Sequence, residues 1–193
     1  MITIALFLVS TAPFAAAVLR GIVRTINYTS PVYTVAIDSV GGLDADLGAP
    51  VSPVFNLTLR IDERTGRRDA CIGHRAAAAV DYRGLVLGRG PAPEFCVDEA
   101  TGAAEAPAVA WGTDIKIPEF LRGQLREELS RGEAAFSVAV RVPNDRTAGN
   151  GPDVVFECRA KVGEESAPCA ETYISARDRD DTFHYRFPIR SIR

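Results

Sequence analysis

A strict alternation of apolar and polar residues from position 55 to position 62 is the feature that most constrains the fold. The apolar positions are Phe55, Leu57, Leu59 and Ile61, and the polar ones are Asn56, Thr58, Arg60 and Asp62. Successive side chains of a strand point to opposite faces, so this period of two predicts a strand with one buried and one solvated face. Asn56-Leu57-Thr58 is an N-glycosylation sequon that such a strand presents on its wet face. Asn56 is therefore a candidate glycosylation site.

Further short segments of strand character recur along the chain between Gly, Pro and Asp turns. They are residues 33–37, 77–82, 85–87, 95–97, 136–142, 154–159, 173–175 and 183–187. Regularly spaced short strands with turn signals predict an all-β, antiparallel sandwich. Residues 98–107, which are rich in Ala, Gly and Glu, and residues 144–152 have the composition of surface loops.

One segment has helical rather than strand periodicity. Leu121, Leu125 and Leu129 recur every four residues and form one apolar stripe of a helix. Pro118 suits the start of a helix and Gly132 the position after its end. The pattern predicts a helix of about three turns that caps the sandwich.

Trp111 and three glycines are predicted to have structural roles. Trp111, the single tryptophan, precedes this helix, where a large side chain is expected to fill the core beneath it; a ligand-stacking role is the alternative. Gly84, Gly88 and Gly90 superficially resemble a phosphate-binding loop but precede no helix, so hairpin turns are the better prediction.

The four cysteines form an even set without a Cys-x-x-Cys pair, which disfavours a zinc ribbon or a thioredoxin-type motif. They are Cys71, Cys96, Cys158 and Cys169. Three disulfide connectivities are open, and we favour Cys158–Cys169 because a glycine and a proline between them allow the chain to reverse between two strands. That leaves Cys71 with Cys96. The alternative is four free thiols in a cytosolic protein.

The amino-terminal segment, residues 2–19, contains no charge and is followed by Arg20 and Arg24. Eighteen helical residues span about 27 Å, the lower limit for a bilayer, so a membrane anchor and a cleaved signal peptide both fit. We divide the chain into this segment with its flank, residues 1–24, and a β domain, residues 25–193. The arginines favour a cytosolic domain, whereas sequons and cysteines favour the opposite side, and we give the latter more weight. A second sequon begins at Asn27 and ranks below Asn56 because it lies close to the anchor.

No catalytic constellation is evident, and no cofactor or metal site is predicted. The two histidines, His74 and His184, cannot build a three-histidine zinc site, and the serine hydrolase elbow and the P-loop are absent from the sequence. Asp178, Asp180 and Asp181 are the densest acidic cluster, but interleaved arginines favour a solvated loop over a calcium site. With 22 Lys and Arg against 25 Asp and Glu, the chain lacks the positive field that nucleic acid requires. Its 47% hydrophobic content also excludes a very hydrophilic disordered protectant.

Several segments in order resemble the plant LEA-2 group of late embryogenesis abundant proteins, which includes the NDR1/HIN1-like membrane proteins. The matching segments are residues 33–37, 53–59, 82–88 and 93–96, with an Ala-Trp-Gly element at 110–112 and a Phe-Leu-Arg-x-Gln-Leu helix at 120–125, as in grass members. The resemblance implies a fibronectin-III-like or immunoglobulin-like sandwich behind one membrane-spanning helix, with the domain outside the plasma membrane. It supplies no catalytic residues.

Three functional hypotheses follow. The leading one is a non-enzymatic protein anchored in the membrane by residues 2–19, whose extracellular sandwich contacts a protein or cell-wall partner in stress or defence responses. The second is a soluble intracellular LEA-2-type protectant with free thiols. The third is a small secreted hydrolase or carbohydrate-binding protein, since sandwiches host unrelated functions.

Overall fold

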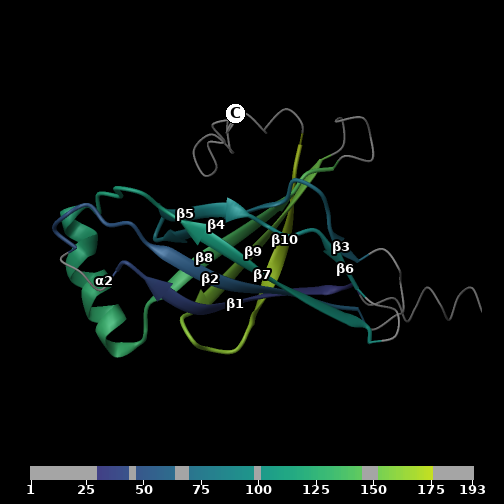
Figure 1. The fold of residues 1–193 in the computed structure, drawn as a ribbon, viewed down its shortest axis with the longest axis horizontal. Coiled ribbons are helices and arrows are strands. Elements are labelled where there is room, and N and C mark those ends of the chain that lie inside the picture. The colour runs from purple at the N-terminus through teal and green to yellow at the C-terminus, as the bar shows by residue number, and fades with distance from the viewer. Residues whose placement is uncertain (1–29, 44–46, 64–69, 98–100, 145–151, 176–193) are drawn as a thin grey trace, which may run out of the picture.

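The computed structural model describes residues 30–43, 47–63, 70–97, 101–144 and 152–175 (Figure 1). The amino-terminal segment, the Asn27 sequon, the acidic cluster at 178–181, His184 and the strand predicted at 183–187 lie outside the described residues. The elements are β1 (Val32–Gly41), β2 (Val54–Asp62), β3 (Cys71–Ile72), β4 (Ala77–Tyr82), β5 (Leu85–Pro91), β6 (Phe95–Cys96), β7 (Ala103–Trp111), α2 (Glu119–Arg131), β8 (Ala135–Val142), β9 (Asp153–Lys161) and β10 (Ala167–Ile174).

The antiparallel, mostly β architecture with one helix is as predicted, but the main sheet closes into an eight-stranded barrel instead of dividing into two separate sheets. The strand order is β1-β10-β9-β8-β4-β5-β7-β2, and β3 pairs with β6 in a separate ribbon. Closure depends on two short junctions. β1 meets β10 at two registered pairs and β5 meets β7 at one, Arg89 opposite Trp111, whereas β1 and β2 pair along most of their length.

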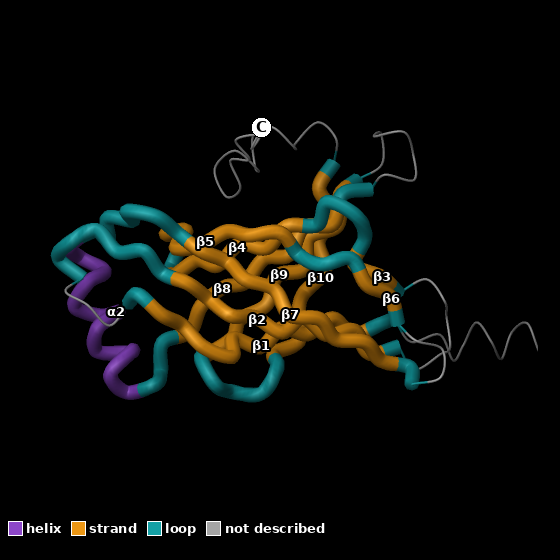
Figure 2. The backbone as a smooth tube through the Cα atoms, in the orientation of Figure 1, coloured by secondary structure: helices purple, strands orange, loops and turns teal. Residues whose placement is uncertain are grey.

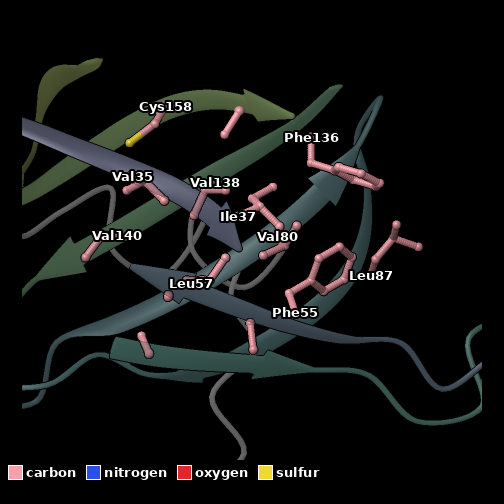
Figure 3. Packing of buried hydrophobic residues seen from close by; sticks show 14 of the residues in the cluster. Val35, Ile37, Phe55, Leu57, Val80, Leu87, Phe136, Val138, Val140 and Cys158 are labelled. Atoms are coloured by element: carbon pink, nitrogen blue, oxygen red, sulfur yellow. The ribbon is translucent and has the colours of Figure 1, made fainter. Parts of the chain in front are cut away.

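The apolar side chains of the strands fill the interior of this barrel (Figure 3). The predicted strand at 55–62 is confirmed, since its four apolar residues are at most 1% exposed and Asn56 is exposed. Phe55 meets Phe136 edge to face with ring centroids 5.3 Å apart, and the Tyr82 ring lies 5.9 Å from that of Phe136. Alternation along each strand thus converts directly into a packed core.

Helix α2 lies at one end of the barrel, and the β3–β6 ribbon lies at the other (Figures 1 and 2). Leu121 and Leu125 are buried and Leu129 is partly buried, which confirms the predicted apolar stripe. Pro118 occupies the position before the first turn, and Gly132 ends the helix with φ of 68°. Glycine adopts that left-handed conformation at a lower conformational energy than other residues do. The position of Gly132 therefore determines where the helix ends.

Residues 103–107 belong to strand β7, so the prediction of a loop over 98–107 is wrong there; residues 98–100 are not described. β7 pairs with β2 along nine registered positions. Pro107 has no N–H to donate, but its registered partner is Thr58 on β2, and the pairing of β7 with β5 is registered at Trp111 and not at Pro107. A loop-like composition is therefore compatible with a strand here because a long partner supplies the pairing.

The prediction that three glycines mark hairpin turns is correct only for Gly84, which has φ of 85° between β4 and β5. Gly88 and Gly90 lie inside β5, where β7 crosses closely. A Cβ on Gly90 would lie 1.9 Å from the carbonyl oxygen of Val109. A Cβ on Gly112, which follows β7, would lie 2.1 Å from that of Leu87. These glycines permit two backbones to touch where the barrel closes.

Candidate functional site

The sequon lies in the middle of β2, the strand between β1 and β7, with its polar side chains on the outer face. Asn56 is exposed, and its Nδ2 donates a hydrogen bond of 2.7 Å to Oγ of Ser39 on β1. Thr58, the third residue of the sequon, donates through Oγ1 to a carboxylate oxygen of Asp38 at 2.8 Å. The acceptor amide is thus held by one of its two N–H groups, and the site is open to solvent.

Trp111 is on this same outer face, so the prediction that it fills the core beneath the helix is wrong. It is the last residue of β7, directly opposite Val54, and it is 47% exposed. Ala110 is the residue that points inward at this position, with no exposed surface. Val54, Val109 and Trp111 together form an exposed apolar group beside the sequon, which we call the valine–tryptophan patch.

Both predicted disulfides are present, and each joins residues that are direct cross-strand neighbours. Cys71 is bonded to Cys96 across β3 and β6, and Cys158 is bonded to Cys169 across β9 and β10. Cys158 is 3% exposed and belongs to the core, so its bridge also ties β10 to the barrel wall. No cysteine remains free.

A cavity of about 520 Å³ opens between α2, the end of β1 and the turn after β9. Its lining residues are Val40, Leu43, Leu47, Arg126, Leu129, Ser130, Gly132, Ala134 and Val162. The wall is mainly aliphatic, and the lining residues include no carboxylate, histidine or cysteine. The cavity thus has the character of an apolar groove and offers no acid–base pair or nucleophilic thiol for catalysis.

A polar network joins α2 to the barrel at the β4–β5 turn. The buried Tyr82 hydroxyl donates to Glu128 at 2.9 Å, and Arg83 and Gln124 donate to the other carboxylate oxygen at 3.0 and 2.8 Å. Burial raises the pKa of Tyr82, and its bond to Glu128 raises it further. Burial opposes ionisation of Glu128, but the hydrogen bonds from Tyr82, Gln124 and Arg83 outweigh it and hold the pKa of Glu128 below its usual value. This arrangement anchors the helix and contains no group poised near neutral pH.

Two further titratable residues outside this network form contacts within the domain. His74 is exposed, and its Nδ1 lies 3.5 Å from a carboxylate oxygen of Glu94. The buried Asp153 accepts a 2.7 Å hydrogen bond from Nε of Arg141, which ties β8 to β9. Within the described ranges, no group of three or more His, Cys, Asp or Glu side chains could hold a metal ion. No helix in those ranges combines the length and the apolar character needed to cross a membrane.

Comparison with known proteins gave no match: no protein-family model, no curated protein and no solved structure resembles the chain significantly.

The sequence identified the sequon and the four cysteines, but it missed the valine–tryptophan patch and the groove beside α2. The patch had a local signal, because Pro107, Val109 and Trp111 alternate with Ala108 and Ala110. Reading residues 103–111 as a strand would have placed Trp111 on the opposite face from Ala110. The groove has no comparable signal, since its wall combines residues that are far apart along the chain.

Proposed function

We propose that this protein is a non-enzymatic glycoprotein of the LEA-2 or NDR1/HIN1-like type, anchored in the plasma membrane by residues 2–19. Its β domain lies outside the cell and contacts a protein or cell-wall partner in plant stress or defence responses. Asn56 carries a glycan, and the two disulfides stabilise the domain in an oxidising environment. The proposal assigns no catalytic residue and no cofactor.

The observation that carries this proposal is the pairing of all four cysteines together with an exposed sequon. Each cysteine lies directly opposite its partner, so both bridges fit the strand register without displacement of the backbone. Disulfides persist in secretory and extracellular compartments, and N-glycosylation takes place on the same side of the membrane. Disulfide formation and N-glycosylation thus support the same location for the domain, on the lumenal or extracellular side of the membrane.

The barrel topology supports the fold that the family resemblance implies. The short junctions β1–β10 and β5–β7 divide the barrel into β7, β2 and β1 on one side and β5, β4, β8, β9 and β10 on the other. If those junctions are regarded as the open edges, the two groups correspond to the facing sheets of a fibronectin-III-like or immunoglobulin-like sandwich.

The test is expression of the full chain in plant cells, followed by membrane fractionation and digestion with an N-glycosidase. We expect the protein in the carbonate-resistant membrane fraction, with a mobility shift on digestion that Asn56→Gln abolishes. Asn27→Gln is the matched control and is expected to retain the shift.

Thiol counting by mass spectrometry without reductant separates this proposal from the intracellular protectant. A soluble, glycosidase-insensitive protein with four free thiols would overturn the membrane-anchored glycoprotein and favour the protectant.

A further inference from the structure

The valine–tryptophan patch is a cluster of three exposed apolar side chains on the outer face of β2 and β7. Val54, Val109 and Trp111 are 40%, 42% and 47% exposed, although all three are in regular strands. Further along the same face, β2 presents Thr58 and Arg60. Val32, which is opposite Asp62 at the other end of this face, is also 45% exposed, but it stands apart from the three clustered side chains beside the sequon. A contiguous exposed apolar patch is a candidate contact surface.

The strand register places the acceptor Asn56 against this patch. Asn56 is directly opposite Val109, and Val54 is directly opposite Trp111. Directly opposed side chains of antiparallel strands have Cβ atoms about 5 Å apart and diagonal ones about 7–8 Å apart. The register therefore places Val109 beside Asn56 and Trp111 diagonally beyond it, while the Asn56 amide itself is hydrogen-bonded to Ser39 on the β1 side.

Glycines on both sides make the patch flat. Gly41 on β1 is opposite Val54, and a Cβ built on it would meet nothing within 4 Å. On the other side, the position of a Cβ on Gly90 is only 3.2 Å from Cζ3 at the far edge of the Trp111 ring. The ring therefore lies across β5, in the space that a side chain at Gly90 would occupy. Trp111 nevertheless remains 47% exposed.

We propose that the glycan on Asn56 folds back over the valine–tryptophan patch of its own domain. The first N-acetylglucosamine packs on Val109 and Val54, and the second stacks on the Trp111 ring. Adjacent strands are about 4.8 Å apart, so the path from β2 across β7 to the ring over β5 is roughly 10 Å, which two sugar units span. The C–H faces of a pyranose complement the electron-rich face of an indole.

The covalent step leaves the native hydrogen bond in place. The Asn56 Nδ2 forms a bond to the anomeric carbon of a lipid-linked oligosaccharide, the bond from that carbon to the pyrophosphate oxygen breaks, and one amide proton leaves to the released lipid pyrophosphate. One N–H remains on Nδ2, the atom that donates to Ser39 in the structure, and is available for that hydrogen bond. Keeping this bond would hold the glycosidic linkage close to the sheet.

This inference rests on the proposed function, because Asn56 meets the glycosylation machinery only on the lumenal side. Trp111 is the single tryptophan, so its fluorescence reports the patch without a substitution. The full chain purified from plant membranes is compared before and after N-glycosidase treatment. Quenching of Trp111 by acrylamide is expected to increase roughly two-fold when the glycan that shields its open face is removed.

Thermal unfolding of matched variants supplies the second measurement. Removing the glycan is expected to lower the melting temperature of the wild type by about 3 °C, and this difference should fall below about 1 °C in Trp111→Ser. Phe120→Ser is the control, since Phe120 is 79% exposed on α2 and does not belong to the patch, so its variant should keep the full difference.

The outcomes separate the two proposals. The protein could be glycosylated and yet show no change in Trp111 quenching or in melting temperature when the glycan is removed. That result would overturn the contact with the patch but would leave the proposed extracellular location unaffected. Membrane-derived protein without a glycan on Asn56 would overturn both.

Discussion

Substitution of Gly90 by alanine is the sharpest test of how this barrel closes. A Cβ at this position would lie 1.9 Å from the carbonyl oxygen of Val109 and 3.0 Å from its carbonyl carbon. Ordinary van der Waals contact begins at 3.4 Å, so β5 and β7 would have to separate by about 3.4 − 1.9 = 1.5 Å at this point. The obstructing atoms are backbone, and they cannot rotate away as a flexible side chain would.

The energetic consequence follows from the shortness of the junction. β5 and β7 share only the registered pair of Arg89 and Trp111, so a separation of this size breaks the junction and opens the barrel wall. Overpacking of a tight site costs about 1–3 kcal/mol, and a lost backbone hydrogen bond adds about 1 kcal/mol. We expect Gly90→Ala to lower the free energy of unfolding by about 3 kcal/mol, which corresponds to a melting temperature roughly 6–12 °C lower for a chain of this length.

Urea unfolding followed by circular dichroism measures this change, and Gly123→Ala is the matched control. Gly123 is exposed on α2, and a Cβ there would meet nothing within 4 Å. Alanine is favoured over glycine inside a helix by about 1 kcal/mol, so the same chemical change should stabilise the protein at this position. A Gly90→Ala variant within 0.5 kcal/mol of the wild type, about the spread of surface substitutions, would refute the closure described for β5 and β7.

Two further predictions concern the helix anchor and a disulfide. Tyr82→Phe should cost about 1 kcal/mol through the lost bond to Glu128. Because the folded pKa of Glu128 lies below the ordinary 4.5, its contribution is complete above that pH and is lost as the pH falls through the folded pKa. The stability difference between wild type and Glu128→Gln, measured by urea unfolding, should therefore shrink below pH 4.5, and a constant difference would contradict the network. Replacing Cys158 and Cys169 together by alanine should cost about 3 kcal/mol for their separation of 11 residues, and unchanged thermal unfolding would contradict it.

Strand β2 could be predicted from the sequence because the alternation within the segment agrees with the burial of its side chains in the folded barrel. Its alternation assigns four side chains to the core, and the same alternation assigns Asn56 to solvent. The helix was predictable for a similar reason, since Pro118 and Gly132 mark its ends and the leucine stripe marks its buried face. The cysteine pairing also followed, because a short separation and a chain reversal restrict Cys158 to one nearby partner.

Trp111 and β7 were mispredicted because burial depends on partners that local composition does not reveal. A tryptophan beside a predicted helix favours the core, but the register with β2 assigns that role to Ala110. Residues 103–107 have the small side chains of a loop, and only the long pairing with β2 makes them a strand. Barrel closure depends on two short junctions, with two registered pairs between β1 and β10 and one, Arg89 with Trp111, between β5 and β7. No sequence pattern predicts that these strands meet.

The glycines of β5 connect the fold to the proposed glycan surface. Gly90 allows the β7 backbone to approach, which closes the barrel, and it also leaves the space across which the Trp111 ring lies. A larger residue would push the strands apart and displace the ring from the sheet at the same time. The flat apolar surface beside Asn56 is thus a direct consequence of closure between β5 and β7, and a barrel that remained open there would not hold Trp111 in a position to meet the sugar.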